Sequence, residues 1–261
     1  MHILVTNDDG VTAPGLLALV QALRQIPDAN ISVLAPHKNW SATGHSKTLH
    51  RPLRVWEVHL ADGSEAMTTD GSPSDCVALA LLGLLEKPVD LVVSGINPNP
   101  NLGHDVTYSG TVTAAMEAVI FGVPAIAVSL DGGYAPQEVL DYRAAAVMAR
   151  RAAQWVGAHG LPEEVLLNIN VPHMPLDALK GARLTRMGRR VYRDRLIRRE
   201  DPWGRKYYWL GGEAPTGVPE EGTDIGALAQ GWVSVTPVQM DMTAHHALTG
   251  LEGLAAEIMR G

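Results

Sequence analysis

The chain has 261 residues, a length that fits one large domain or two small ones. Hydrophobic residues make up 46% of it, which excludes a disordered chain because a folded core can form. The single cysteine, Cys76, excludes a disulfide scaffold and favours a reducing compartment. No apolar run approaches the roughly 20 residues that a membrane helix needs, and the first residues lack the basic segment of a signal peptide. We therefore expect a cytoplasmic protein that does not enter a membrane.

The formal net charge of −7 is unevenly distributed. Residues 183–206 contain ten basic and three acidic residues, whereas the rest of the chain holds 11 basic and 25 acidic ones. Such a basic segment is either a solvated arm or an arm that docks on an acidic neighbouring subunit or a polyanion. The negative net charge argues against a large nucleic-acid footprint, so a nucleic-acid partner is not expected.

Short apolar runs alternate with helical patterns over the first two thirds of the chain. In chain order we predict a strand at residues 3–6, a helix at 16–23, strands at 31–35, 53–60 and 65–69, a helix at 76–85, a strand at 91–94, a helix at 111–121, a strand at 125–129, a helix at about 137–157 and a strand at 165–171. This alternation predicts an α/β fold in which helices flank a mostly parallel sheet.

From residue 181 the character of the sequence changes. The basic segment carries several aromatic residues and leads into a stretch rich in glycine and proline at residues 211–222, a pattern that predicts a β-hairpin arm. A strand at 233–237 and a helix at 248–259 follow. We divide the chain into an α/β core (1–180), a basic aromatic arm (181–230) and a C-terminal strand and helix (231–261).

Ligands of such sheets bind where loops leave the carboxyl ends of the strands. Asp8 and Asp9 follow the first predicted strand. Two adjacent carboxylates repel each other, and a hard divalent cation such as Mg²⁺ or Mn²⁺ would offset that repulsion. The alternative is a solvated turn, because Asn-Asp and Asp-Gly are common turn pairs. Asn97, after the strand at 91–94, could add a neutral carbonyl oxygen or could equally belong to a turn.

Two further loops carry polar donors. Ser109, Gly110 and Thr111 precede a helix, where free N–H groups and the helix dipole favour a phosphate. The alternative is simple N-capping by a hydroxyl. The loop after the second strand offers Ser41 as a hydroxyl ligand and His45 as a phosphate contact or acid, although a lone loop histidine is usually just solvated.

Several rival chemistries lack their motifs. The sequence contains no P-loop, no G-x-G-x-x-G turn after the first strand and no G-x-S-x-G nucleophile elbow. It also lacks a Cys/His cluster for structural zinc.

Taken in order, the motifs resemble the stationary-phase survival protein SurE, a family of metal-dependent 5′-nucleotidases. The matching segments run over nearly the whole chain: I-L-V-T-N-D-D-G-V-x-A-P-G, A-P-x-x-x-x-S, G-S-P-S-D-C-V, D-L-V-V-S-G-I-N, N-L-G, Y-S-G-T-V-T-A-A-M-E-A, G-V-P-A-I-A-V-S, L-N-I-N-V-P, G-T-D and V-S-V-T-P. The resemblance implies a Rossmann-like core with a C-terminal extension, in which a β-hairpin arm exchanges with a neighbouring subunit to form a homodimer or homotetramer.

Carried over by motif, the resemblance implies one divalent metal ion per subunit, Mg²⁺ or Mn²⁺. Its ligands would be Asp8, Asp9, Ser41 and Asn97. The phosphate side would be lined by Asn101, Ser109, Gly110 and Thr111. The chain departs from the family pattern in three places, with Asn99 for a glycine, Ser72 for a threonine and Ser41-Ala42-Thr43-Gly44 for Ser-Gly-Ala-Ser.

The implied reaction hydrolyses nucleoside 5′-monophosphates, with 3′-nucleotides and short polyphosphate as further substrates. The expected route is attack by a metal-activated water, with Asp8 or Asp9 as the base. A covalent aspartyl-phosphate is the alternative route. The competing class is a non-enzymatic protein, in which the acidic loop is a structural cation site and the basic arm binds nucleotide or nucleic acid.

Overall fold

The computed structural model describes residues 1–133 and 139–258. Its strands are β1 (His2–Thr6), β2 (Asn30–Pro36), β3 (Val55–His59), β4 (Glu65–Thr69), β5 (Leu91–Asn97), β6 (Ala125–Asp131), β7 (Val165–Pro172), β8 (Ala182–Leu184), β9 (Arg190–Glu200), β10 (Lys206–Gly217) and β11 (Val233–Gln239). Its α-helices are α1 (Pro14–Leu23), α2 (Pro73–Leu79), α3 (Gly110–Ile120), α4 (Arg143–His159), α5 (Asp224–Ala229), α6 (His245–Leu248) and α7 (Glu252–Ile258).

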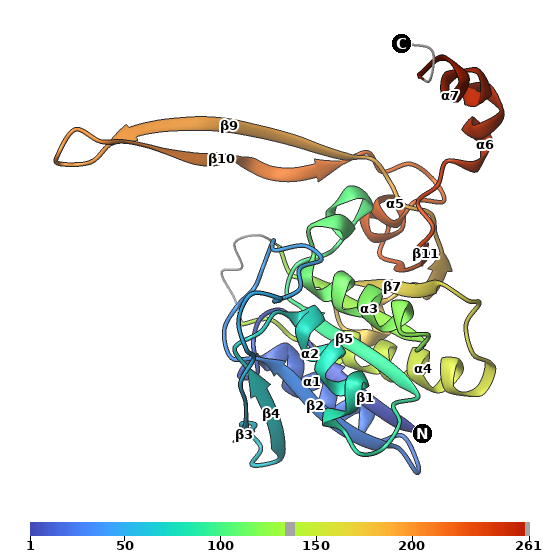
Figure 1. The fold of residues 1–261 in the computed structure, drawn as a ribbon. Coiled ribbons are helices and arrows are strands. Elements are labelled where there is room, and N and C mark those ends of the chain that lie inside the picture. Colours follow the sequence, from blue (N-terminus) through green and yellow to red (C-terminus); the bar gives the residue numbers. More distant parts are fainter. Residues whose placement is uncertain (134–138, 259–261) are drawn as a thin grey trace.

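Among the described residues, nine strands form one sheet in the order β3-β4-β2-β1-β5-β6-β7-β11-β8 (Figure 1). Every neighbouring pair from β4 to β7 is parallel, whereas β3 and β11 run antiparallel to β4 and β7. Helices cover both faces of this sheet, and β9 with β10 forms the expected hairpin. The predicted α/β fold class is therefore confirmed.

Alternation along the buried strands decides which helices cover each face. In β1, Ile3 and Val5 pack into a cluster with side chains of α1 and α4, such as Leu16. Leu4 points the other way and packs with side chains of α2 and α3, such as Val112. Because side chains of a strand alternate between faces and both faces are covered, a continuous apolar run is required here.

Some element boundaries differ from the sequence prediction. The helix expected at 76–85 is α2 followed by a π-helical turn, Ala80–Leu84, in which Gly83 has φ = 116°. The helix expected from about residue 137 begins at Arg143 within the described residues, and residue 137 itself lies outside them. The C-terminal helix is divided into α6 and α7 by a 3₁₀ turn, and the predicted last residue, 259, also lies outside the described part.

The sequence prediction missed short elements and gave no bounds for the strands of the hairpin. Neither β8 nor the six-residue helix α5 was expected, because both are too short to show a period. Most of the stretch rich in glycine and proline belongs to β10, which continues to Gly217. A long hairpin partner holds these residues extended in spite of their low strand propensity.

The arm formed by β9 and β10 extends away from the body of the molecule (Figure 1). Its root is fixed to the core, because Arg190 Nε donates to Asp105 Oδ2 at 2.6 Å and the Tyr192 hydroxyl donates to Asp105 Oδ1 at 2.6 Å. In the chain the arm lies between β8 and β11, which both belong to the core sheet. The boundaries of the three units stay a prediction.

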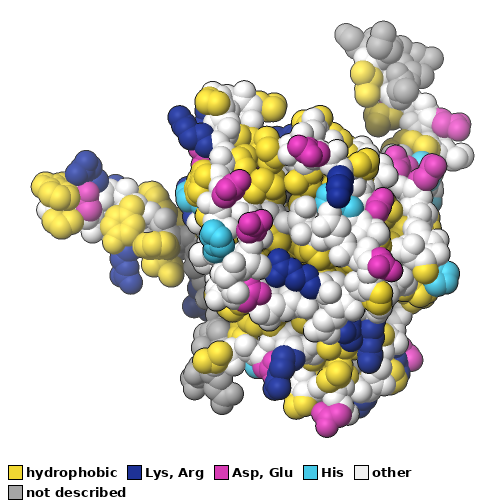
Figure 2. Space-filling view, turned by 90° about the horizontal axis from the view of Figure 1, so that it is seen from below, with side chains coloured by type: hydrophobic (Ala, Val, Ile, Leu, Met, Phe, Trp, Pro, Cys, Tyr) yellow, Lys and Arg dark blue, Asp and Glu magenta, His cyan; other side chains and the backbone are white. Residues whose placement is uncertain are grey.

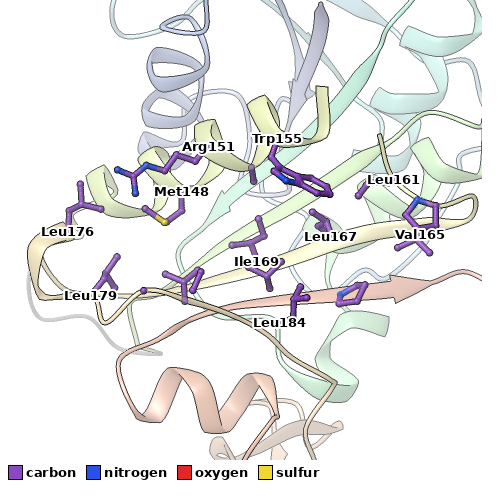
Figure 3. Close-up of a pocket in the computed structure, with 17 residues that line it drawn as sticks. Met148, Arg151, Trp155, Leu161, Val165, Leu167, Ile169, Leu176, Leu179 and Leu184 are labelled. Carbon is purple, nitrogen blue, oxygen red and sulfur yellow. The ribbon is translucent and has the colours of Figure 1, made fainter. Parts of the chain in front are cut away.

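An apolar groove of about 890 Å³ lies between α4 and the strands β7, β11 and β8. Figure 3 shows side chains such as Met148, Trp155, Leu167 and Leu184 around it. It contains none of the candidate site residues, which lie at the carboxyl ends of the strands.

In the described part of the chain, no helix combines the length and the hydropathy needed to cross a bilayer.

Asp224 joins the core to the root of the arm. Its carboxylate is fully buried and accepts hydrogen bonds from the backbone N–H groups of Gly103 (2.8 Å), Gly188 (2.7 Å) and Ile225 (2.8 Å). Three buried donors would lose their partner if this side chain were removed, and hydrogen bonds to charged groups are the strong ones.

We predict that Asp224→Ala lowers the free energy of unfolding by about 3 kcal/mol or more, since it leaves buried N–H groups unpaired. Urea unfolding at one fixed protein concentration measures the change. The control is Glu221→Ala, which removes an exposed carboxylate three residues away. Equal stability of the two variants would contradict the prediction.

Candidate functional site

The candidate site lies where β1 and β5 end side by side. Thr6 pairs with Ser94 in the parallel register, and Asp9 and Asn97 each follow three residues later. Neighbouring strands are about 4.8 Å apart, so the loops that carry these two residues leave the sheet together. The strands that lead to Asp8 and Asp9 and to Asn97 are therefore neighbours in the sheet.

Asp8 contacts the first turn of α3. Thr111 Oγ1 donates to Asp8 Oδ1 at 2.5 Å, and the Asp8 side chain is buried. A methyl group at Gly110 would lie 2.7 Å from Asp8 Cβ and 2.9 Å from Asp8 Oδ2. Gly110 therefore allows an approach that no other residue would permit, and the N-terminus of α3 faces the carboxylate.

Ser109 is the N-cap of α3. Its Oγ accepts a hydrogen bond from the N–H of Val112 at 3.1 Å, so the capping alternative is what the structure shows for this hydroxyl. The N–H groups of Gly110 and Thr111 interact with Asp8 and favour its charged form. A phosphate contact by this helix end stays a prediction, supported by its position next to Asp8.

The two carboxylates are unfavourable together without a cation. Burial raises the pKa of Asp8 above its usual range, although the Thr111 hydroxyl opposes the shift. Burial and the neighbouring charge of Asp8 raise the pKa of Asp9 to about 7, against a hydrogen bond from Asn39. A divalent cation would favour the charged form of both groups.

The segment after β2 contacts the backbone of Asp8 and the carboxyl group of Asp9. The N–H of Trp40 donates to the Asp8 carbonyl oxygen at 2.7 Å, and Asn39 Nδ2 donates to Asp9 Oδ1 at 3.1 Å. The Asn39 Oδ1 in turn accepts the N–H of Ser41 at 2.8 Å. Asn39 therefore links the candidate ligand Ser41 to Asp9. The sequence prediction gave Asn39 no role, because nothing in the residue pattern separates it from an ordinary turn asparagine.

His45 binds a residue of α3 rather than the end of that helix. Its Nε2 lies 2.7 Å from Glu117 Oε2, and Lys47 Nζ lies 2.6 Å from Glu117 Oε1. Glu117 follows Gly110 by seven residues, which is about 10 Å along a helix axis. A direct contact between His45 and a phosphate stays a prediction. The sequence prediction missed Glu117, which lies among apolar residues on a helix.

The side-chain amide nitrogen of Asn97 already donates a hydrogen bond. Nδ2 donates to the Asn99 carbonyl oxygen at 2.5 Å, which leaves the side-chain carbonyl oxygen as the atom suited to a cation. Within the described residues, Asn99 Oδ1 is buried without a hydrogen-bond partner. This loop therefore offers two amide oxygens that are not used by the hydrogen bond between Asn97 and Asn99.

Asn101 is fixed by the ends of β6 and β7. Its Nδ2 donates to Ser129 Oγ at 2.8 Å, and its N–H donates to Asn170 Oδ1 at 2.8 Å. Asn168 and Asn170 both donate to its carbonyl oxygen, at 2.8 and 3.1 Å. The two β7 asparagines were missed as site residues, although polar side chains two apart in a buried strand were a usable signal.

The residues present fit a hard cation. Among the residues that the structure describes, no group of three or more His, Cys, Asp or Glu side chains is placed to hold a metal. The candidate set combines two carboxylates with hydroxyl and amide oxygens, which suits Mg²⁺ or Mn²⁺ rather than zinc. Fold and site together define an α/β protein in which a buried carboxylate at the end of the first strand contacts a helix N-terminus.

Comparisons with known proteins identify the family. The model of the survival protein SurE family matches residues 3–194. Proteins named 5′-nucleotidase SurE are similar throughout: the one from Herpetosiphon aurantiacus is 56% identical over 243 residues (93% of this chain, 94% of that protein), and the one from Chloroflexus aggregans is 53% identical over 255 residues (96% and 98%). The crystal structure of the SurE protein from Aquifex aeolicus matches with a TM-score of 0.81 and 37% identity, covering 98% of this chain and 100% of that one. The chain belongs to the SurE family.

We predict that Gly110→Ala destabilises the protein by about 1–3 kcal/mol, because the new methyl group forces Asp8 and α3 apart. Thermal unfolding measures the effect. The matched control is Gly250→Ala, where a methyl group meets no atom within 4 Å. Indistinguishable melting temperatures would show that the helix can recede from Asp8 freely.

Proposed function

We propose that the protein is a divalent-metal-dependent phosphomonoesterase that hydrolyses nucleoside 5′-monophosphates to nucleoside and phosphate. The observation that carries this proposal is the contact of Asp8 with the N-terminus of α3. A cation bound by Asp8 would lie next to a helix end that favours anions, which supports the proposal. The relatives named 5′-nucleotidase SurE, 53% and 56% identical to this chain, support the same reaction.

In this proposal Asp8, Asp9, Ser41 and Asn97 hold one ion, Mg²⁺ or Mn²⁺. When bound, such an ion withdraws charge from a phosphate oxygen and lowers the pKa of a bound water. The four residues supply only oxygen ligands, which both ions accept.

The protein side chains bind and orient the phosphoryl group. We infer that the N-terminus of α3, at Gly110 and Thr111, stabilises charge on phosphoryl oxygens, and that Ser109 and Asn101 line the same phosphate side. His45 completes the proposed phosphate side as a more distant group, held by Glu117.

Asp9 is the better candidate for the base. Asp8 is committed to Thr111 and α3, whereas Asp9 is partly exposed and has a single side-chain partner, Asn39, among the described residues. We favour direct attack by water over a covalent aspartyl-phosphate, because a carboxylate that binds a cation is a poor nucleophile.

We predict that Asp8→Asn lowers the release of phosphate from nucleoside 5′-monophosphates at least about 100-fold, because the ion loses a charged ligand. The assay uses a panel of 5′-nucleotides, 3′-nucleotides and short polyphosphate, first with EDTA and then with Mg²⁺ or Mn²⁺ restored. Asp177→Asn, an exposed carboxylate far along the chain, is the control.

The outcome separates the two classes of function. Metal-dependent release that Asp8→Asn abolishes and Asp177→Asn leaves intact supports the hydrolase. A wild-type protein that releases no phosphate with any metal would refute the proposal and favour a binding protein with a structural cation site.

We also propose that the arm joins subunits into a homodimer or homotetramer. Leu196, Trp203, Trp209 and Leu210 on the arm are each more than 60% exposed. Figure 2 shows hydrophobic side chains together with lysine or arginine at the end of the arm. An isolated two-stranded ribbon with this composition gains stability when its apolar side chains are covered, and the acidic body of another copy complements its charge.

We predict that replacing Leu196, Trp209 and Leu210 together by serine lowers the molar mass in solution, because the apolar contact of the arm is lost while its root at Asp105 is kept. Light scattering after size-exclusion chromatography measures the mass. Leu82→Ser, at a 73% exposed position on the body, is the control. An unchanged mass of the triple variant would exclude an arm-mediated oligomer.

A further inference from the structure

Glu117 is a buried carboxylate that the proposed reaction does not use. Its side chain is 2% exposed, yet one oxygen lies 2.7 Å from His45 Nε2 and the other 2.6 Å from the Lys47 ammonium. Burial alone would raise the pKa of Glu117, but His45 and Lys47 hold it below its usual value. A buried carboxylate is costly to separate from such partners, because an unpaired buried charge would remain.

Both partners of Glu117 come from one irregular segment, residues 37–48, which connects β2 to the rest of the fold. Its first half contacts the candidate metal site through Asn39 and Trp40. Its second half lies along α3, where the N–H of Gly44 donates to the Tyr108 carbonyl oxygen at 3.0 Å. The segment therefore spans from the paired carboxylates to Glu117, and Ser41 lies between these two attachments.

The same helix fixes both ends of this arrangement. Thr111, in the first turn of α3, binds Asp8, and Glu117 lies six residues further, about 9 Å along the axis. One turn beyond Glu117, the Phe121 ring lies 5.2 Å from the Lys47 ammonium. The position of the segment relative to Asp8 is thus set through one rigid element.

We propose that Glu117 is a positioning residue: by binding His45 and Lys47 it holds residues 37–48 against α3, and this places Ser41 beside Asp8 and Asp9 before a metal ion binds. Only the last step rests on the proposed function, since the attachment of the segment is independent of catalysis. A segment that is already ordered loses less conformational entropy when its side chain coordinates an ion.

The first test measures the segment itself. In Glu117→Gln, hydrogen exchange of the Trp40 and Gly44 amides is expected to be about tenfold faster or more, because local opening becomes easier, while exchange in β7 stays as in the wild type. Lys47→Met, which removes a half-exposed side chain, should give the same pattern and guards against a folding defect in the buried variant.

The second test measures binding of Mn²⁺ alone by electron paramagnetic resonance. We expect Glu117→Gln and Lys47→Met each to weaken Mn²⁺ binding about 10- to 100-fold, the range for groups that orient metal ligands. The double variant should be no weaker than Glu117→Gln, since the two side chains act through one contact. Glu220→Gln, which breaks the exposed ion pair with Arg186, is the matched control and should leave binding unchanged.

Unchanged exchange of Trp40 and Gly44 in both variants would overturn the proposal. So would additive losses in the double variant, which mean that Glu117 acts only through the stability of α3. If the wild-type chain binds no Mn²⁺, the proposed metal site fails, and the exchange rates alone then decide whether Glu117 holds the segment. Normal Mn²⁺ binding without phosphate release would instead refute the proposed reaction. The role of Glu117 would then still be decided by hydrogen exchange and Mn²⁺ binding, which do not depend on that reaction.

Discussion

The contact between Asp8 and the first turn of α3 is the constraint on which the rest of the site depends. It brings a buried carboxylate within 2.5 Å of the Thr111 hydroxyl and leaves no room for a side chain at position 110. Burial by itself disfavours the charged form of Asp8. The contact nevertheless places this negative group at the positive end of the helix dipole. The proposed cation site and the proposed phosphate side therefore depend on one contact.

Helix α3 also sets the positions of the segments that pack against it. The helix binds Asp8 at its first turn and residues 37–48 at Glu117, and its N-cap Ser109 begins it in the right place. Because a helix is rigid over this length, the contact at Glu117 sets where residues 37–48, and with them Ser41, lie relative to Asp8. Residues 37–48 form no strand and are held instead by the contacts of His45 and Lys47 with Glu117 of α3.

At the end of the sheet opposite β3, carboxylates attach the root of the arm to the core. The arm leaves the chain between β8 and β11, two strands of the core sheet, and its root is fixed by Asp105 and Asp224. Carboxylates that accept several hydrogen bonds thus fix the places where extended or irregular backbone meets the core. The ribbon beyond the root has no core of its own, and its large apolar side chains are exposed in the single chain.

The residue pattern by itself determined the alternation of strands and helices, the parallel sheet and the strand ends that carry Asp8, Asp9 and Asn97. Those features follow from local periodicity, because a doubly covered sheet needs continuous apolar strands and because parallel strands end at one edge. The Gly110 and Thr111 turn was also visible as a helix start. Short elements such as α5 were not, since six residues show no period.

Only the tertiary structure decided which polar groups meet. The link from Ser41 through Asn39 to Asp9, the burial of Glu117 between His45 and Lys47, and the asparagines of β7 around Asn101 join residues up to about seventy positions apart. A turn asparagine and a helical glutamate look alike in a sequence whether they are solvated or buried. Their roles depend on long-range packing, which no local pattern encodes.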